Sequence, residues 1–259
     1  MKRTNNLNWA LFFLAGILGL NLSSVLHLVY ESFPPYLLPN IGQVADSFKT
    51  SPAVWLKAFI YTFSFSLLAG LLVILLGTLL GSFAAYFRLW SVDRWLQLIW
   101  SIPLIAIATY LLLVVGYGWL YGLILAIFLG LYPVQKHVFD SCSLMSEGIC
   151  SIAASFGLSR WQEFRHLRVK SSLFSMGTAL SQALPLCFIG ETMGEFTVGE
   201  IHPWIGLGGL LRQAQSSGDY PKLWLCILLM MFLVYCSGEA VAILWNRGFQ
   251  NPTKKEFFQ

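Results

Sequence analysis

The sequence predicts an all-α membrane protein with six transmembrane helices and with both termini in the cytoplasm. Of its 259 residues, 57% are hydrophobic and only 11% are charged, whereas about 25% of the residues of a soluble domain are charged. The same composition, with 15% aromatic residues, excludes a disordered chain. The charged residues are also clustered, and they leave uncharged stretches long enough to cross a bilayer.

These stretches supply the six predicted spans, because about 20 helical residues cross about 30 Å of hydrocarbon. Glu191 and Glu195 lie at the end of the fifth span, and Glu239 interrupts the sixth. Residues 95–135 form an uncharged stretch of 41 residues, which is long enough for two spans and divides at Gly116-Tyr117-Gly118. Residues 1–259 are therefore expected to form a single transmembrane domain. Its predicted spans are residues 8–30, 58–87, 95–115, 119–135, 171–195 and 223–246.

The distribution of lysine and arginine predicts the orientation of these spans, because positive charge is retained on the cytoplasmic side. Twelve of the 16 basic residues fall on the face that carries both termini. The first span is interpreted as an uncleaved signal anchor, since no convincing small-x-small cleavage site follows it. The net charge of +4 reflects this asymmetry, and nucleic-acid binding is not expected.

The external segment 31–57 contains four prolines and one short amphipathic piece. Ile41, Val44, Ala45 and Phe48 repeat at the helical spacing i, i+3, i+4, i+7, and Asn40 is available as the N-cap. This pattern predicts an interfacial helix. Such a helix either lies on the bilayer surface or helps to receive a partner, and the sequence leaves both alternatives open.

The cytoplasmic segment 136–170 is predicted to form a helix-turn-helix. Its first helix places four apolar residues at helical spacing, namely Ile149, Ile152, Ala153 and Phe156. Gly157 follows as a helix-ending residue that is free to take positive φ. Ser159 and Gln162 then form an S-x-x-Q capping box, which starts the second helix. A membrane protein without a soluble domain has little use for such an element unless a partner docks there.

The stretch 153–165 resembles the cytoplasmic "EAA" loop of the permease subunits of bacterial ATP-binding cassette (ABC) importers. The family pattern is E-A-A, three residues, Gly, nine residues, I-x-L-P, and Gly157 aligns with its glycine. Ser151 then stands in place of the glutamate and Lys170 in place of the proline. The resemblance implies contact with an ATPase for nine residues: Ala153, Phe156, Gly157, Ser159, Arg160, Trp161, Glu163, Phe164 and Arg165. Trp161 and Phe164 either anchor this docking surface or pack beneath the loop against their own chain.

Further segments resemble the permeases that transport nitrate, sulfonates, taurine and thiamine precursors. These segments are Leu38-Pro39-Asn40 with Val44 and Phe48, Ile102-Pro103, Tyr132-Pro133, Gly194-Glu195-Phe196 and Gly206-Leu207-Gly208. The resemblance implies two cytoplasmic ATPase subunits, a second copy of this chain in a homodimer, an external substrate-binding protein and the bacterial inner membrane. The G-E-F element leans toward heterocyclic vitamin precursors as the solute, over taurine or nitrate.

The chain itself is not expected to be an enzyme or to carry a cofactor or a metal ion. It contains no G-x-x-x-x-G-K-[ST] loop, so ATP hydrolysis is expected in the partner. The five cysteines show no metal-ligand spacing and are interpreted as packing residues. Two alternatives to an importer are a secondary carrier, for which no inverted repeat is visible, and an intramembrane hydrolase, for which no H-E-x-x-H motif is present.

Glu191 and Glu195 are the candidate residues of the translocation pathway. They lie four residues apart and share a face of the fifth predicted span, close to the outer edge of the hydrocarbon. In one interpretation Glu191 contacts cargo or a gate at the external mouth, and Glu195 shapes the loop toward Gly206. In the other, both are ordinary solvated carboxylates at the membrane interface.

Overall fold

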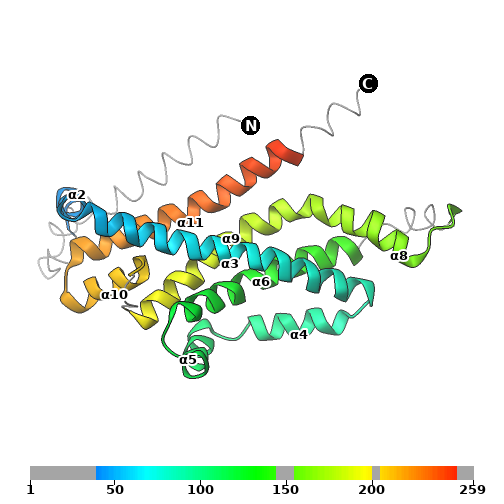
Figure 1. Ribbon diagram of the computed structural model, residues 1–259, viewed down its shortest axis with the longest axis horizontal. Helices are drawn as coiled ribbons and strands as arrows, with labels where there is room; N and C mark the ends of the chain where they lie inside the picture. The colour runs from blue at the N-terminus through cyan, green and yellow to red at the C-terminus, as the bar shows by residue number, and fades with distance from the viewer. Residues whose placement is uncertain (1–38, 144–154, 200–204, 250–259) are drawn as a thin grey trace, which may run out of the picture. The chain divides into compact units, whose positions relative to one another are not determined.

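The structure is a computed structural model that describes residues 39–143, 155–199 and 205–249, and every regular element in these residues is helical (Figure 1). The predicted span at residues 8–30 lies outside the described residues. The elements are α2 (Ile41–Thr50), α3 (Pro52–Tyr86), α4 (Trp90–Trp100), α5 (Leu104–Val115), α6 (Trp119–Ser143), α8 (Arg160–Glu163), η2 (Phe164–Arg168), α9 (Val169–Val198), α10 (Leu207–Ser217) and α11 (Tyr220–Phe249).

The described residues divide into two compact units. Unit 1 comprises those within 1–61 and 195–232, and unit 2 comprises those within 62–194 and 233–259. Three described helices are long and apolar enough to cross a membrane, namely α3, α6 and the Tyr220–Trp245 part of α11. They correspond to three of the predicted spans. The 30-residue α9 is not among these three helices.

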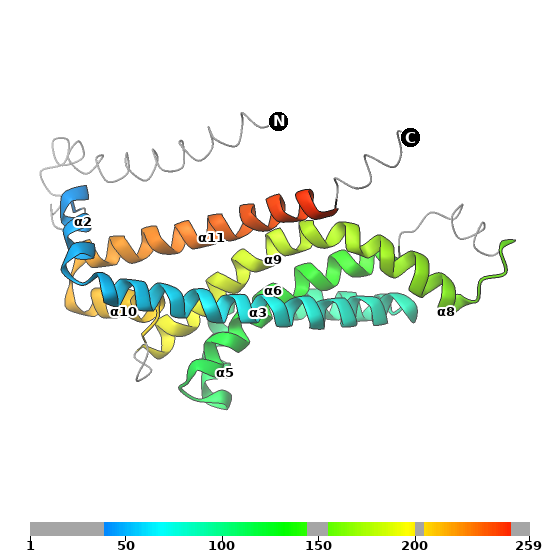
Figure 2. The ribbon, with the colours of Figure 1, turned by 45° about the horizontal axis from the view of Figure 1, so that its top comes forward.

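The residues of the predicted span 95–115 do not form one continuous helix. Two helices, α4 and α5, take its place, and the residues Asp93–Trp100 and Leu104–Val115 are bent by 91° at the break between them (Figure 2). The cause is Pro103, which has no N–H to donate to the preceding turn and which disfavours helical geometry at Ile102. If α4 and α5 form one broken span, the described helices supply up to four crossings.

The helix that contains the predicted span 119–135 extends into the predicted cytoplasmic segment 136–170. Helix α6 does not end near Gln135 but continues through Pro133 to Ser143. The predicted first helix falls largely within residues 144–154, outside the described residues. The second predicted helix is present: α8 begins at Arg160, and η2 and α9 continue it without a break to Val198.

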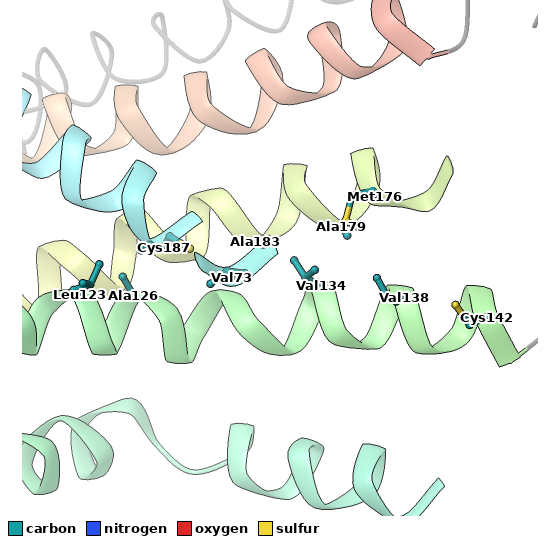
Figure 3. Packing of buried hydrophobic residues seen from close by; sticks show 11 residues of the cluster. Val73, Leu123, Ala126, Val134, Val138, Cys142, Met176, Ala179, Ala183 and Cys187 are labelled. Carbon is teal, nitrogen blue, oxygen red and sulfur yellow. The ribbon is translucent and has the colours of Figure 1, made fainter. Parts of the chain in front are cut away.

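The core of unit 2 lies among α3, α6 and α9. Small and medium-sized side chains form it, among them Val73, Val134, Ala183 and Cys187 (Figure 3). The helices approach closely because glycines line the contact: a Cβ atom added at Gly77 would lie 2.8 Å from Val134 Cγ1. Small residues at helix contacts are typical of membrane proteins.

In unit 1, the predicted amphipathic helix is confirmed as α2. The N–H of Asn40 donates to Gln43 Oε1 at 3.0 Å, which satisfies a donor at the start of the helix. Trp55 of α3 is buried, and its indole N–H donates to the carbonyl oxygen of Ser47 at 3.1 Å. This bond holds α2 against the start of α3. Of the predicted apolar face, Val44 is buried, whereas Ile41 and Phe48 are exposed.

Candidate functional site

The turn before α8 has the geometry that the sequence predicted. Gly157 has φ of +70°, a left-handed conformation that only glycine adopts without strain. The N–H of Ser159 donates to Gln162 Oε1 at 2.9 Å, and the N–H of Gln162 donates to Ser159 Oγ at 3.3 Å. Both halves of the capping box are therefore formed, and they fix the point at which α8 begins.

The residues around this turn form an exposed surface of apolar and basic side chains. Phe156 is 79% exposed and Trp161 is 55% exposed. Arg160 and Arg165 are also exposed. We call Phe156, Arg160, Trp161 and Arg165 the tip surface. Ala153, which was assigned to the same surface, lies outside the described residues. Large apolar side chains that protrude among cations are typical of surfaces that bind another protein.

Phe164 differs from the tip surface because it packs within its own chain. It is only 7% exposed, and its ring centroid lies 5.0 Å from that of Tyr86 in α3. Tyr86 also contacts Trp161 edge to face, at 5.7 Å between centroids. Phe164 thus packs against its own chain and does not anchor a docking surface. Trp161 does some of each, since it packs on Tyr86 and keeps half of its surface exposed.

Glu163, which was expected to be a surface contact, has a partner in the same chain. Its Oε1 accepts from Arg168 Nη2 at 2.8 Å and from Arg168 Nε at 2.9 Å, and both side chains are about four-fifths buried. Arg168 Nη1 also donates to the carbonyl oxygen of Cys142 in α6, at 2.7 Å. These bonds join α8, η2 and the end of α6.

Glu191 is buried in unit 2 and is not a solvated interfacial carboxylate. It is only 1% exposed. It faces Gly122 of α6, where an added Cβ atom would lie 2.9 Å from Glu191 Oε1. Gly194, one turn later, packs against the backbone of Gly122. The two glycines bring α9 and α6 close together and leave room for the carboxylate between the helices.

Glu195, in unit 1, is also buried, with 3% exposure. Its Oε2 accepts from the N–H of Gly208 at 2.8 Å, in the first turn of α10, where four backbone N–H groups lack helical partners and a negative charge is favourable. Gly206 lies against the same carboxylate and has no room for a side chain. Arg212 of α10 donates in return to the carbonyl oxygen of Thr197, at 2.6 Å, near the end of α9.

Unit 2 contains an ionic cluster that the sequence did not predict. Lys136 of α6 lies 2.8 Å from Asp93 Oδ2 of α4 and 3.1 Å from Asp140 Oδ1. Asp93 is buried. The i,i+4 spacing of Lys136 and Asp140 was a detectable signal for a continuing α6, although the partner 43 residues earlier was not. Among the described residues, no group of three or more His, Cys, Asp or Glu side chains is arranged to hold a metal ion.

Comparison with known proteins places these elements in a family. Residues 73–247, more than half of the chain, match the family described as "Binding-protein-dependent transport system inner membrane component". The chain belongs to this family. It is therefore a binding-protein-dependent ABC permease, a multi-pass protein of the inner membrane. The matched region includes the tip surface, the ionic cluster, Glu191 and Glu195, and it excludes α2.

Three relatives agree with the family assignment. A probable ABC transporter permease protein of Haemophilus influenzae is 24% identical over 219 residues, which cover 83% of this permease and 87% of the relative. The formylaminopyrimidine transport permease ThiX of Halalkalibacterium halodurans is 27% identical over 56% of this chain and 57% of its own. The riboflavin transport system permease RibX of Chloroflexus aurantiacus is 24% identical over 56% and 55%, respectively.

Proposed function

We propose that this permease is the membrane subunit of an ATP-driven importer and forms the pathway for a small solute that an external binding protein delivers. Two cytoplasmic ATPase subunits supply the energy, since the 259 residues contain no phosphate-binding G-x-x-x-x-G-K-[ST] loop. A second copy of the chain completes the pathway as a homodimer. The family assignment supports this division of labour.

The observation that carries the proposal is the tip surface. Gly157 and the capping box of Ser159 hold Phe156 and Trp161 in exposed positions, with Arg160 and Arg165 beside them. Aromatic and arginine side chains dominate the energy of protein interfaces. The tip surface is the docking site of the ATPase, and rigid-body movement of the ATPase reaches the transmembrane helices through α8 and α9.

The proposed topology keeps six spans with both termini in the cytoplasm. Helices α3, α6 and α11 are three of them, and α4 with α5 forms a fourth, broken crossing. Residues 8–30 and α9 complete the six. The excess of lysine and arginine on one face supports this orientation.

The proposed solute is a heterocyclic vitamin or vitamin precursor. Two relatives are named for the transport of formylaminopyrimidine and of riboflavin. The G-E-F element of residues 194–196 points in the same direction. Glu191 is proposed to line the pathway, because ionisable groups buried in membrane proteins mark solute routes more often than structural positions.

Co-purification tests the docking step. Affinity-tagged wild-type permease, isolated from its native membrane, is expected to retain a P-loop ATPase. Phe156→Asp and Trp161→Asp are expected to lose it, because each puts an unpaired charge at the centre of the interface. Tyr117→Asp, at a 77% exposed tyrosine in the turn between α5 and α6 and outside the predicted spans, is the matched control. Retention of the ATPase in both tip variants, or equal loss in the control, would contradict the proposal.

A further inference from the structure

The helix that begins at Arg160 contains one irregular turn, and this turn separates the tip surface from α9. Residues Phe164–Arg168 are wound as a π-helix, in which the N–H of Val169 donates to the carbonyl oxygen of Phe164, five residues earlier. Such turns are rare, arise mostly as single turns within α-helices and occur frequently at functional sites. A π turn accommodates one residue more than an α turn does.

The ion pair of Glu163 and Arg168 spans this turn from end to end. Residues five apart on an α-helix point about 140° away from each other, because each residue turns the helix by about 100°. In the π turn they come round to the same side, which allows Oε1 of Glu163 to accept both Nε and Nη2 of Arg168. The pair therefore depends on the π register, and it stabilises that register in return.

Contacts on either side of the π turn show that its winding determines how α8 is rotated relative to α9. Arg168 is tied to the end of α6 by its bond to the carbonyl oxygen of Cys142. Phe164, at the start of the turn, is buried against Tyr86 of α3, whereas Arg165 points outward. Relaxation of the turn to a regular α-helix of the same sequence would rotate α8 by about 100° relative to α9. That rotation would move Phe164 away from Tyr86.

We propose that Glu163 and Arg168 are positioning residues, whose ion pair keeps the extra residue in the π turn and thereby sets the rotational position of the tip surface relative to α9. Glu163 is then an internal support of the docking site and not a contact to the partner. The consequence for ATPase binding rests on the proposed function. The register itself is a property of the permease alone.

A one-residue deletion provides the sharpest test. When His166 is removed, Val169 and Phe164 are four residues apart, and the same N–H to carbonyl bond becomes a regular α-helical bond. Glu163 and Arg168 also become four apart, a spacing at which side chains pair on an α-helix. The deletion therefore removes the π turn and keeps the orientation of α8. If the ion pair serves the register, it becomes dispensable in this background.

The measurement is the rate at which a maleimide labels a cysteine introduced by Phe164→Cys, in purified permease without ATPase. The parent chain, which keeps its native cysteines, gives the background. Labelling is expected to be slow, since position 164 is buried, and at least ten-fold faster after Glu163→Ala. Deletion of His166 in the Glu163→Ala chain should return the rate to within two-fold of its starting value. His166→Ala, at an exposed residue of the same turn, is the control and should change nothing.

Two results would overturn the inference: labelling that Glu163→Ala does not accelerate, or acceleration that the deletion does not reverse. Melting temperatures confirm folding, and Arg168→Gln replaces Glu163→Ala if that chain does not fold. ATPase co-purification, measured separately, distinguishes this inference from the proposed function. The expected labelling pattern with undiminished ATPase binding in Glu163→Ala would overturn docking at the tip surface and leave the register inference standing. If Glu163→Ala loses the ATPase without a change in labelling, the register inference is overturned and docking at the tip surface stands.

Discussion

At the scale of single residues, three of the predicted site residues have roles that depend on backbone geometry or on a partner in the same chain. Gly157 has positive φ, as predicted. Glu163 was assigned to the partner surface, and it bonds instead to Arg168. Glu195 was expected either to shape the loop toward Gly206 or to be solvated, and it accepts from the N–H of Gly208. Neither bond is visible in the sequence, because the first needs a π turn and the second joins residues 13 apart through a loop.

Gly157→Val should reduce ATPase co-purification strongly without preventing membrane insertion. A β-branched residue at φ of +70° costs about 1–2 kcal/mol, and relief of that strain redirects α8. Gly118→Val is the control, since an added Cβ atom there meets no atom within 4 Å and φ is not positive. Normal ATPase binding by Gly157→Val would show that the left-handed turn is not required.

Glu195→Ala should lower the melting temperature of the purified permease. The substitution removes a buried hydrogen bond and a favourable charge at the start of α10, an expected loss of about 1–3 kcal/mol. Glu195→Gln keeps an acceptor and should lose less, about 1 kcal/mol. Thermal unfolding followed by tryptophan fluorescence measures both. Equal melting temperatures of the wild type, Glu195→Ala and Glu195→Gln would mean that Glu195 behaves as a solvated carboxylate.

At the scale of helices, length and apolarity predicted α3, α6 and α11, and failed where polar side chains or proline alter a helix. Pro103 divides a stretch that contains no charge, so composition gave no sign of the 91° bend. Lys136 marked the start of the predicted cytoplasmic segment, yet it pairs with Asp140 on α6, which continues to Ser143. Asp93 of α4 is buried beside Lys136. This ion pair completes the cluster and joins α4 to α6.

Asp93→Asn and Lys136→Met should each destabilise the permease more than the double variant does. Loss of Lys136 leaves the buried charge of Asp93 without its cation, and loss of Asp93 leaves Lys136 with Asp140 alone, at a cost of about 1–3 kcal/mol for this partly exposed cluster. Removal of both avoids that penalty, and a double-mutant cycle from denaturation midpoints gives the coupling. Additive single and double values would mean that the pair does not hold α4 to α6.

At the scale of the whole molecule, two features were predictable from the sequence: family membership and the helical structure of the described residues. A short glycine-centred motif indicates the first, and the length of the hydrophobic stretches indicates the second. The burial of the two carboxylates was not predictable. It depends on Gly122, which lies 69 residues before Glu191, and on Gly206, which lies beyond the loop that follows Glu195. Sequence spacing placed these carboxylates on one helical face, and packing determined what surrounds them.

Glu191→Gln should reduce solute uptake by the complete importer at least several-fold while ATPase co-purification stays normal. Glutamine keeps the size of the side chain and removes its charge, so the close approach at Gly122 is preserved. Ser216→Ala, at an exposed position of α10, is the control. Unchanged uptake by Glu191→Gln would exclude a role of the charge in the pathway.

ATP-dependent uptake in proteoliposomes tests the central claim most directly. The vesicles contain the permease and its co-purified ATPase, and the binding protein with its bound radiolabelled solute is added outside. The account predicts uptake that requires ATP, the binding protein and an intact phosphate-binding lysine in the ATPase. Uptake that persists without ATP and follows an imposed proton or sodium gradient would identify a secondary carrier and contradict the account.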